Sequence, residues 1–411
     1  MPHPVRHLAV ETTRLLRERR GIGRYVRNVL RELTVQQPQL QFTLFVQRTS
    51  EIAAMRDLLD GLYPGLGAWA RIEPIGELAR TDADIVWYPW NQLTVPHPRA
   101  TMIATVHDLA PMHRHDHRWW KVLKRAKYHR RYARTLARAH GILTISEFSR
   151  REVLDRFDVP PDKVSVTLLA ADDLTLSTSG DMSSLDRAAC GAGFFLSVGG
   201  QEARKNLTTL YTAMDRLWAR GIEIPLVQCG PGLSRETRAR RAQAPWLRHL
   251  GYVTDAQLVT LYRHATALVF PSRYEGFGLP VLEAMRAGGV VVCSTASSLP
   301  EVAGNAALTV PWDDAEALAH AMQRVYDDAT LRAQLQAGGP LHAAAFSWAR
   351  TASETFSAMQ RAVATHRAST SHRHTRPPFW TRVRTFTRSL PPLAQTAVVR
   401  AASRLHDAFD R

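Results

Sequence analysis

The sequence is poor in cysteine and in long apolar runs, and each shortage excludes a class of protein. Only three of its 411 residues are cysteines, and Cys190, Cys229 and Cys293 lack the close paired spacing of a structural zinc site. An odd, sparse set of cysteines also excludes a disulfide framework. No run approaches the roughly 18 consecutive apolar residues that a membrane-spanning helix needs.

The amino terminus has little apolar character as well. Residues Met1–Val10 carry proline, histidine and arginine where a secretory signal would have an apolar run, so we expect a cytoplasmic protein. Hydrophobic residues make up 45% of the chain and aromatic residues 8%, which is typical of a folded globular protein. The length favours two domains and an extension.

Acidic residues are outnumbered, with 37 Asp and Glu against 53 Lys and Arg, and the net charge is +16. Such a charge suits nucleic acid, an anionic membrane or an anionic small molecule. The cations are densest between Arg118 and Arg138, where no Asp or Glu occurs. Apolar residues at helical spacing accompany them: Trp119, Trp120, Leu123, Tyr132 and Leu136.

This pattern predicts a helix that buries an apolar stripe and displays cations elsewhere. Its basic face fits an anionic membrane surface or a phosphate-bearing lipid acceptor, and the alternative is a merely solvated face. No recognised nucleic-acid-binding signature accompanies the charge, so we expect no nucleic-acid partner.

Strand-like runs alternate with helix-like runs along most of the chain, which predicts an α/β protein. The apolar runs are His7–Val10, Phe42–Val46, Asp84–Tyr88, Thr101–Val106, Gly141–Ile145, Phe194–Val198, Ile224–Gln228, Arg248–Val253, Ala267–Phe270 and Val290–Cys293. A less periodic stretch, Ala170–Gly180, separates two such series. We therefore predict two Rossmann-like, doubly wound parallel-sheet domains, over residues 1–175 and 176–350, a helix over 351–366 and a basic amphipathic tail over 367–411.

The tail combines aromatic and basic residues in a helical pattern. Phe379, Trp380, Val383 and Phe386 recur at helical spacing beside arginines, and Pro391 interrupts the pattern. Short helices of this kind suit the surface of an anionic bilayer. The alternative is a helix pair packed on the protein or on a second copy.

The first candidate site follows the run Phe194–Val198. Ligands of doubly wound sheets bind outside the carboxyl ends of strands, and here the segment contains Gly199, Gly200, Arg204, Lys205 and Asn206. The glycines permit close backbone approach, Asn206 is suited to cap the next helix, and the two cations favour an anion such as a diphosphate. A solvated turn with two surface cations is the alternative.

The second candidate follows Ala267–Phe270. Two glutamates, Glu275 and Glu283, enclose the sequence Gly276-Phe277-Gly278-Leu279-Pro280. The glycines leave backbone amides bare ahead of a helix that Pro280 is suited to begin, so the segment is another site for an anion. The two carboxylates accept hydrogen bonds from hydroxyl groups, which suits a sugar and a ribose.

This second segment resembles the donor-binding signature of retaining glycosyltransferase family four, the group 1 glycosyltransferases, in which seven residues separate two glutamates. The Arg204-Lys205-Asn206 segment is similar to the diphosphate-binding loop of that family. The resemblance extends from Val5 to Ala364 and implies the GT-B fold, in which an acceptor-binding domain and a donor-binding domain face a cleft. It also implies that Glu275 holds a sugar hydroxyl and that Glu283 holds the ribose.

Two further segments match the family. Gly21 and Gly23 follow the first strand, and the resemblance implies that their loop faces the donor diphosphate, whereas a tight turn that starts a helix is the alternative. His107 follows Thr101–Val106 and corresponds to a histidine close to the donor sugar and the reacting centre. The nearby His113, His115 and His117 lack a strong metal-ligand spacing, so we expect a loop on the acceptor side and no metal site.

The combination of these segments is similar to bacterial mannosyltransferases that build surface polysaccharides, lipopolysaccharide among them, from GDP-mannose. The resemblance implies transfer with retention to a glycan or lipid-linked acceptor. The cations and preorganised amides are expected to stabilise the leaving diphosphate, so we expect no metal or other cofactor. Other sugar nucleotides stay open as donors, UDP-hexoses and dTDP-rhamnose among them. So do a GT-B epimerase or phosphorylase and a non-catalytic sugar-nucleotide-binding protein.

Overall fold

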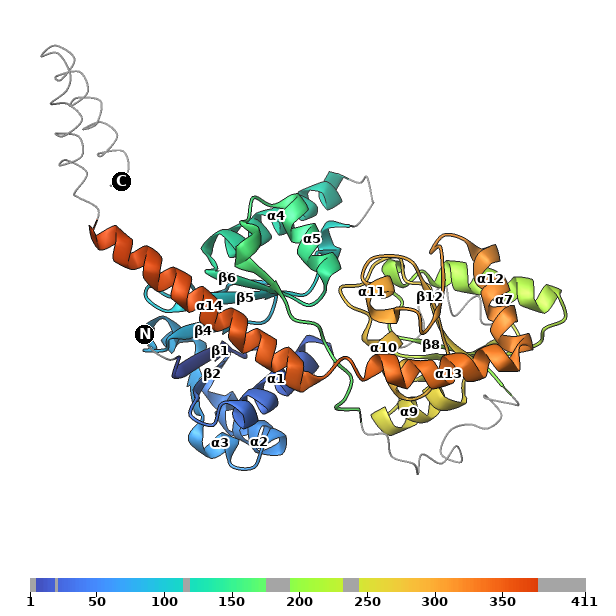
Figure 1. The fold of residues 1–411 in the computed structure, drawn as a ribbon, viewed down its shortest axis with the longest axis horizontal. Coiled ribbons are helices and arrows are strands. Elements are labelled where there is room, and N and C mark those ends of the chain that lie inside the picture. The colour runs from blue at the N-terminus through green and yellow to red at the C-terminus, as the bar shows by residue number, and fades with distance from the viewer. Residues whose placement is uncertain (1–4, 19–20, 114–118, 175–192, 232–243, 376–411) are drawn as a thin grey trace, which may run out of the picture. The chain divides into compact units, whose positions relative to one another are not determined.

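A computed structural model describes the chain except for residues 1–4, 19–20, 114–118, 175–192, 232–243 and 376–411 (Figure 1). Residues up to Ala362 form one compact unit, and those from Val363 on form a second. The first predicted domain boundary, at 175, lies outside the described residues. Of the tail predicted over 367–411, residues 367–375 form the end of the last helix and residues 376–411 lie outside the described residues.

The first unit contains two sheets, and every pair of neighbouring strands in them is parallel. One sheet has seven strands in the order β3 (Arg71–Pro74), β2 (Gln41–Val46), β1 (His7–Glu11), β4 (Ile85–Tyr88), β5 (Thr101–Val106), β6 (Gly141–Thr144) and β7 (Val164–Val166). The other has six in the order β10 (Leu247–Gly251), β9 (Leu226–Cys229), β8 (Phe195–Val198), β11 (Ala267–Phe270), β12 (Val291–Ser294) and β13 (Leu308–Val310). The predicted α/β class with two doubly wound parallel sheets is confirmed.

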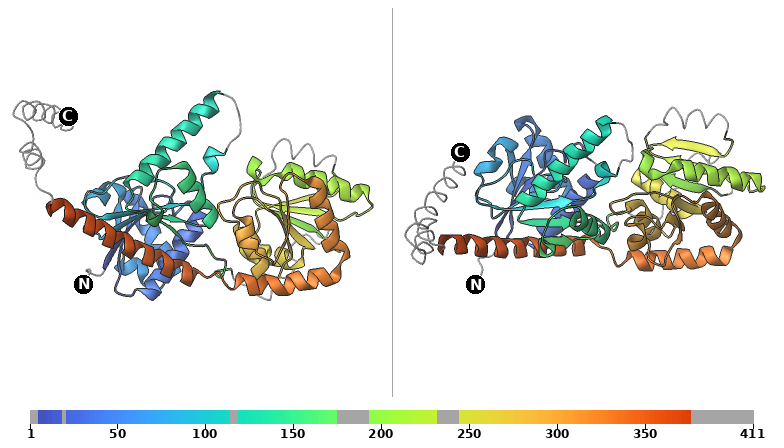
Figure 2. Two further views of the ribbon diagram at one scale, coloured as in Figure 1. Left: turned by 45° about the horizontal axis from the view of Figure 1, so that its top comes forward. Right: turned by 90° about the horizontal axis from the view of Figure 1, so that it is seen from above.

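Helices connect the strands and pack on the faces of the sheets (Figures 1 and 2). In the amino-terminal half they are α1 (Ile22–Gln36), α2 (Ile52–Leu62), α3 (Leu66–Trp69), α4 (Trp119–Arg138) and α5 (Glu147–Arg156). In the carboxyl-terminal half they are α7 (Leu207–Ala219), α9 (Asp255–His264), α10 (Leu279–Arg286), α11 (Leu299–Ala303), α12 (Ala315–Asp327), α13 (Ala329–Ala343) and α14 (Trp348–Thr375). Short 3₁₀ turns lie at η1 (Thr49–Glu51), η2 (Ile75–Arg80), η3 (Ala110–Met112), η4 (Pro161–Lys163) and η6 (Ala203–Lys205).

Strand β5 shows why these runs are almost continuously apolar. All six of its residues are buried, because helices cover both faces of a parallel sheet. Ala104 and Val106 pack with Tyr132 and Leu136 of α4, whereas the intervening Thr105 lies on the other face, where the Tyr25 hydroxyl of α1 is 3.5 Å from its Oγ1.

The last helix, α14, begins at Trp348 and contains residues 351–366, over which the sequence predicts a helix. Its first half packs against the seven-stranded half of the chain. The Trp348 ring lies 6.4 Å from that of Tyr25, and the carbonyl of Ala349 accepts a hydrogen bond from Gln36. Among the described residues, no helix is both long enough and apolar enough to cross a membrane.

The order of the strands places a switch point in each sheet. The direction of winding reverses between β1 and β4 in the first sheet and between β8 and β11 in the second. Ligands of doubly wound sheets bind at such points, outside the carboxyl ends of the strands. The predicted site segments follow β1, β5, β8 and β11, at or beside these two points.

Candidate active site

The loop after β8 brings two cations to the switch point of the second sheet. Gly199 and Gly200 follow the strand directly, and Arg204 and Lys205 lie in the 3₁₀ turn η6 just before α7. Asn206 has a left-handed backbone, and its side chain does not cap α7, so the predicted cap is wrong. Its amide instead donates hydrogen bonds to the carbonyls of Pro271, at 3.0 Å, and Trp312, which ties the loop to the segments after β11 and β13.

Both cations pair with Glu275. The Glu275 carboxylate lies 2.7 Å from Arg204 Nη1 and 2.8 Å from Lys205 Nζ. Burial alone would raise the pKa of Glu275, but Lys205 and then Arg204 outweigh it and lower that pKa, so the carboxylate is ionised at neutral pH. The same pairing raises the pKa of Arg204 against the effect of its own burial.

The exposure of the two cations differs. The side chain of Arg204 is 35% exposed and that of Lys205 is 11% exposed, with its ammonium 4.5 Å from the centre of the Phe270 ring. The ion triad is therefore more enclosed than an open turn with surface cations would be. Its three charged groups are already in contact without a ligand, and Arg204 is the most exposed of them.

The glycine loop between the two glutamates packs against the strand-end segment of β5. A Cβ on Gly276 would lie 2.4 Å from the carbonyl oxygen of His107, so only glycine allows this approach. Ser298 fixes the loop by donating to the carbonyls of Glu275 and Phe277 at 3.0 and 2.7 Å.

The end of this loop starts the next helix. Gly278 precedes α10, Leu279 is its first residue, and Pro280 lies in its first turn, as predicted. The Phe277 ring is buried and meets Phe346 edge-on, so its side chain contributes packing.

His107 is at the carboxyl end of β5 and is buried. Its Nε2 lies 2.7 Å from the carbonyl of Pro89, which can only accept, so Nε2 carries the proton. Burial lowers the pKa of His107 to about 4, and the ring is neutral at physiological pH. Its backbone amide donates to Asn91 Oδ1 at 2.6 Å, which holds the turn after the strand.

The glycines after β1 shape the start of α1. Gly21 is its N-cap, and a Cβ on Gly23 would collide with the carbonyl of Glu18. Their neighbour Arg24 donates to Glu283 Oε1, and Tyr262 donates to the other oxygen of that carboxylate at 2.9 Å. Glu283 is the fifth residue of α10 and is therefore one turn into the helix, as predicted.

Several hydrogen bonds at the site join residues that are far apart in the sequence. The Tyr274 hydroxyl donates to Glu152 of α5 at 2.5 Å and accepts from the amide of Leu109 at 2.9 Å. His113 pairs with the same Glu152. Burial raises the pKa of Asp108, which lies near Arg204.

Within the described part of the chain, no group of histidine, cysteine and acidic residues has the arrangement of a metal site. His115 and His117 lie outside the described residues. The predicted residues thus form two groups: Arg204, Lys205 and Glu275 are in direct contact, whereas Glu283 pairs with Arg24. The carbonyl of His107 approaches the first group through Gly276.

Known families match both halves of the chain. Residues 19–168 match Glycosyltransferase Family 4, and residues 189–341 match Glycosyl transferases group 1. The chain is 33% identical to an O-antigen chain mannosyltransferase B from Escherichia coli over 72% of its length and 77% of that protein. The chain belongs to the group 1 and family 4 glycosyltransferases.

Further relatives carry related names. A serotype-specific mannosyltransferase WbdA from Escherichia coli is 30% identical over 61% of the chain, a match that covers 32% of the longer relative. An MMP alpha-(1->4)-mannosyltransferase from Mycolicibacterium hassiacum is 30% identical over 64% of the chain and 66% of that protein.

Solved structures show the fold. A glycosyltransferase from Rickettsia africae superposes with a TM-score of 0.66, at 13% identity, over 88% of the chain and 99% of that structure. A sucrose-phosphate synthase from Thermosynechococcus elongatus superposes with a TM-score of 0.64, at 17% identity, over 88% of the chain and all of that structure. These are GT-B glycosyltransferases, and the predicted GT-B fold is confirmed.

Proposed function

We propose that this glycosyltransferase is a hexosyltransferase that moves mannose from GDP-mannose to a glycan or lipid-linked acceptor in the assembly of a bacterial surface polysaccharide. The mannosyltransferase names of its relatives support the sugar. The observation that carries the proposal is the ion triad of Arg204, Lys205 and Glu275. Its two cations suit a diphosphate, and its carboxylate suits a sugar hydroxyl that donates a hydrogen bond.

In the proposed reaction the bond between the sugar C1 and the donor phosphate breaks as the acceptor oxygen bonds to C1 on the same face. The acceptor proton passes to a phosphate oxygen of the leaving diphosphate. Lys205 and Arg204 stabilise the charge that develops on that diphosphate, and the ionised Glu275 accepts a hydrogen bond from a sugar hydroxyl. Glu283 accepts from the ribose hydroxyls, and His107 borders the reacting centre.

We expect transfer to continue in EDTA, because these cations and loop amides offer the stabilisation that a metal gives elsewhere. The one Asp-x-Asp spacing in the sequence, Asp82 and Asp84, lies just before β4, at the amino end of that strand. Ligands of doubly wound sheets bind at the carboxyl ends of the strands. Asp84 accepts from the amide of His7 at the amino end of β1, and Asp82 pairs with the His7 ring.

The test is transfer from GDP-mannose to a soluble α-mannoside, with and without EDTA, followed by the anomeric configuration of the product. Equal rates and an α-linked product support the proposal. Loss of activity in EDTA that added Mg²⁺ or Mn²⁺ restores would refute metal independence. Turnover of UDP-hexoses or dTDP-rhamnose in place of GDP-mannose would refute the donor assignment.

The basic helix α4 supports the proposal that the protein binds an anionic membrane. Tyr132 and Leu136 bury one side of it against β5, as predicted. The cations on its described part are all exposed: Lys124, Arg125, Lys127, Arg130, Arg131, Arg134 and Arg138. The side chains of Trp119, Trp120 and Leu123 lie outside the described residues. Because Tyr132 and Leu136, the described part of the predicted apolar stripe, are already packed, we propose that α4 binds a bilayer by electrostatic attraction.

We expect a variant with Arg130, Arg131 and Arg134 changed to Gln to bind anionic liposomes roughly 100-fold more weakly, since each cation near such a surface contributes about 1 kcal/mol. Sedimentation with liposomes of phosphatidylglycerol measures this. The matched control changes the exposed Arg56, Arg71 and Arg99 to Gln. Equal binding by both variants would show that α4 is only a solvated face.

A further inference from the structure

Arg24 lies at the centre of a buried ion network that connects the amino-terminal loop to the donor signature. Its Nε and Nη2 donate to the two carboxylate oxygens of Asp173, both at 2.6 Å, and its Nη1 donates to Glu283. The side chains of Arg24, Asp173 and Glu283 are 18%, 15% and 9% exposed. Charges this enclosed depend on their partners, because water solvates them poorly.

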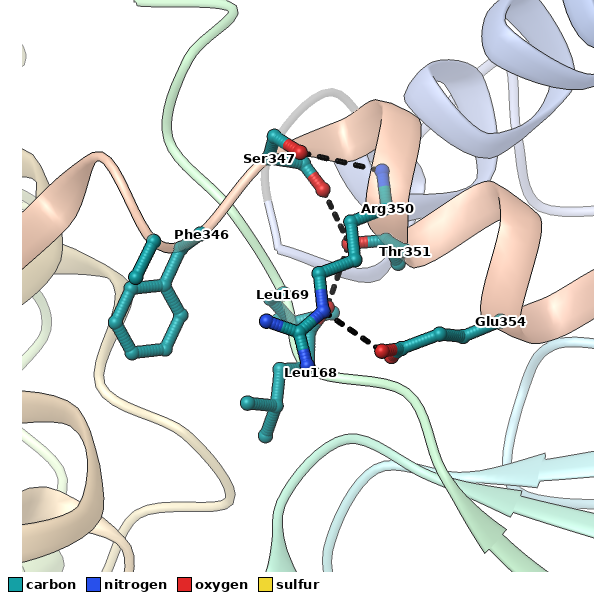
Figure 3. A pocket seen from close by; sticks show the side chains of 8 residues that line it. Leu168, Leu169, Phe346, Ser347, Arg350, Thr351 and Glu354 are labelled. Carbon is teal, nitrogen blue, oxygen red and sulfur yellow. Dashed lines mark hydrogen bonds and ion pairs between the residues drawn. The ribbon is translucent and has the colours of Figure 1, made fainter.

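Asp173 belongs to the segment that runs from the first sheet toward the second, and the returning chain holds it there. Trp348 Nε1 donates to Asp173 at 2.8 Å, and the Trp348 amide donates to Asp172 at 2.9 Å. One turn further along α14, Thr351 donates to the carbonyl of Leu168 (Figure 3), and the two oxygens are 2.6 Å apart. The two connections between the sheets are thus tied together beside Asp173.

Four hydrogen bonds fix the orientation of the Asp173 carboxylate. Arg24 and Trp348 donate to one of its oxygens, and Arg24 and Asn28, at 2.8 Å, donate to the other. Burial would raise the pKa of Asp173, but Arg24 outweighs it and lowers that pKa, so the carboxylate stays charged. The planar guanidinium is therefore clamped on one edge, and its remaining nitrogen is directed at Glu283.

We propose that Arg24 is a positioning residue that orients the Glu283 carboxylate for the ribose of the donor, and that Asp173 sets Arg24 in place. Arg24 and Tyr262 each donate to one oxygen of Glu283, so the carboxylate plane is fixed before a ligand arrives. A preorganised acceptor loses less entropy when it binds a diol. Because Asp173 lies on a segment that connects the two sheets, this segment then influences the affinity for the donor through Arg24 and Glu283. This inference rests on the proposed function of Glu283.

A double-mutant cycle on GDP binding tests the proposal. Calorimetry gives the dissociation constant of GDP for the parent, Arg24→Ala, Glu283→Ala and the double variant. We expect each single variant to bind GDP roughly 10-fold or more weakly, and the double variant to bind within about 2-fold of Glu283→Ala, because Arg24 acts through that carboxylate. The matched control is Arg31→Ala on the same helix, whose partner is its neighbour Glu32.

Milder variants keep the test open if Arg24→Ala does not fold. Arg24→Lys keeps the charge without the planar fork, and Asp173→Asn keeps the shape without the charge, so both should weaken GDP binding while the kcat at saturating donor changes less than KM. A purely structural ion pair would lower the melting temperature and leave the affinity of the folded protein unchanged, which would overturn the proposal. So would additive losses in the cycle. A parent that binds UDP or dTDP and not GDP would instead refute the proposed donor, and the cycle is then measured with that nucleotide. A parent that binds none of the three would refute the proposed function itself.

Discussion

Replacing Lys205 by alanine is expected to slow sugar transfer by roughly 100-fold or more. The ammonium is preorganised 2.8 Å from Glu275 and sits over the Phe270 ring, so in the proposed reaction it stabilises the leaving diphosphate without reorganising. Removal of one such group costs about that factor in other enzymes. Arg204→Ala should act in the same direction, and initial rates at saturating GDP-mannose measure both.

Folding needs its own control in this experiment. Lys205 is more enclosed than an open loop would leave it, and its loss leaves the buried Glu275 with one cation. We therefore expect a lower melting temperature for Lys205→Ala and a smaller decrease for Lys205→Arg. Arg220→Ala, which removes a cation from the end of α7 that pairs with Glu316, should keep the parental rate. A folded Lys205→Ala enzyme that transfers at the parental rate would contradict the role.

Glu275→Ala and Glu283→Ala are expected to fail in different ways. A contact to the ribose holds the donor equally in the ground state and the transition state, so its loss weakens binding. A contact to the transferred sugar orients the reacting carbon, so its loss lowers kcat. We expect Glu283→Ala to raise the dissociation constant of GDP roughly 10-fold or more, and Glu275→Ala to lower kcat by roughly 100-fold with a smaller change in GDP affinity.

The structure adds one complication to Glu275→Ala. That variant leaves Arg204 and Lys205 without their carboxylate, and the freed cations can hold a diphosphate more tightly. Glu275→Gln, which keeps the shape, separates this electrostatic effect from the loss of the hydroxyl contact. Equal losses of GDP affinity in the Glu275 and Glu283 variants would contradict the division of roles.

The periodicity of the sequence was sufficient to predict most of the sheets. Strands such as β5 and β11 were predicted with their observed bounds, because both faces are covered and the runs are uniformly apolar. Strands β3, β7 and β13 were not predicted. They are three or four residues long and lie at the edges, where polar residues such as Arg71 and Glu73 interrupt the pattern.

The site was predictable where it depends on short segments that follow strands. The strand-to-helix loops carry Arg204, Lys205 and the glycines in local order, and the strand order then brings these segments to the switch points. Long-range pairing was not predictable. Arg24 is 259 positions from Glu283, and Glu152 is 122 positions from Tyr274, so no spacing in one sequence relates them.

Asn206 illustrates a local rule overridden by tertiary contact. Asparagine before a helix is a good cap by propensity. Here the left-handed backbone turns its amide toward carbonyls of two other loops, and these hydrogen bonds replace the cap. The same residue therefore joins three loops at the end of the second sheet.

A crystal structure of the protein with GDP tests the central claim most directly, because it locates the diphosphate. We expect phosphate oxygens within about 3 Å of Lys205 Nζ and the Arg204 guanidinium, and ribose hydroxyls at the same distance from Glu283. A diphosphate bound elsewhere, with the ion triad of Arg204, Lys205 and Glu275 untouched, would contradict it.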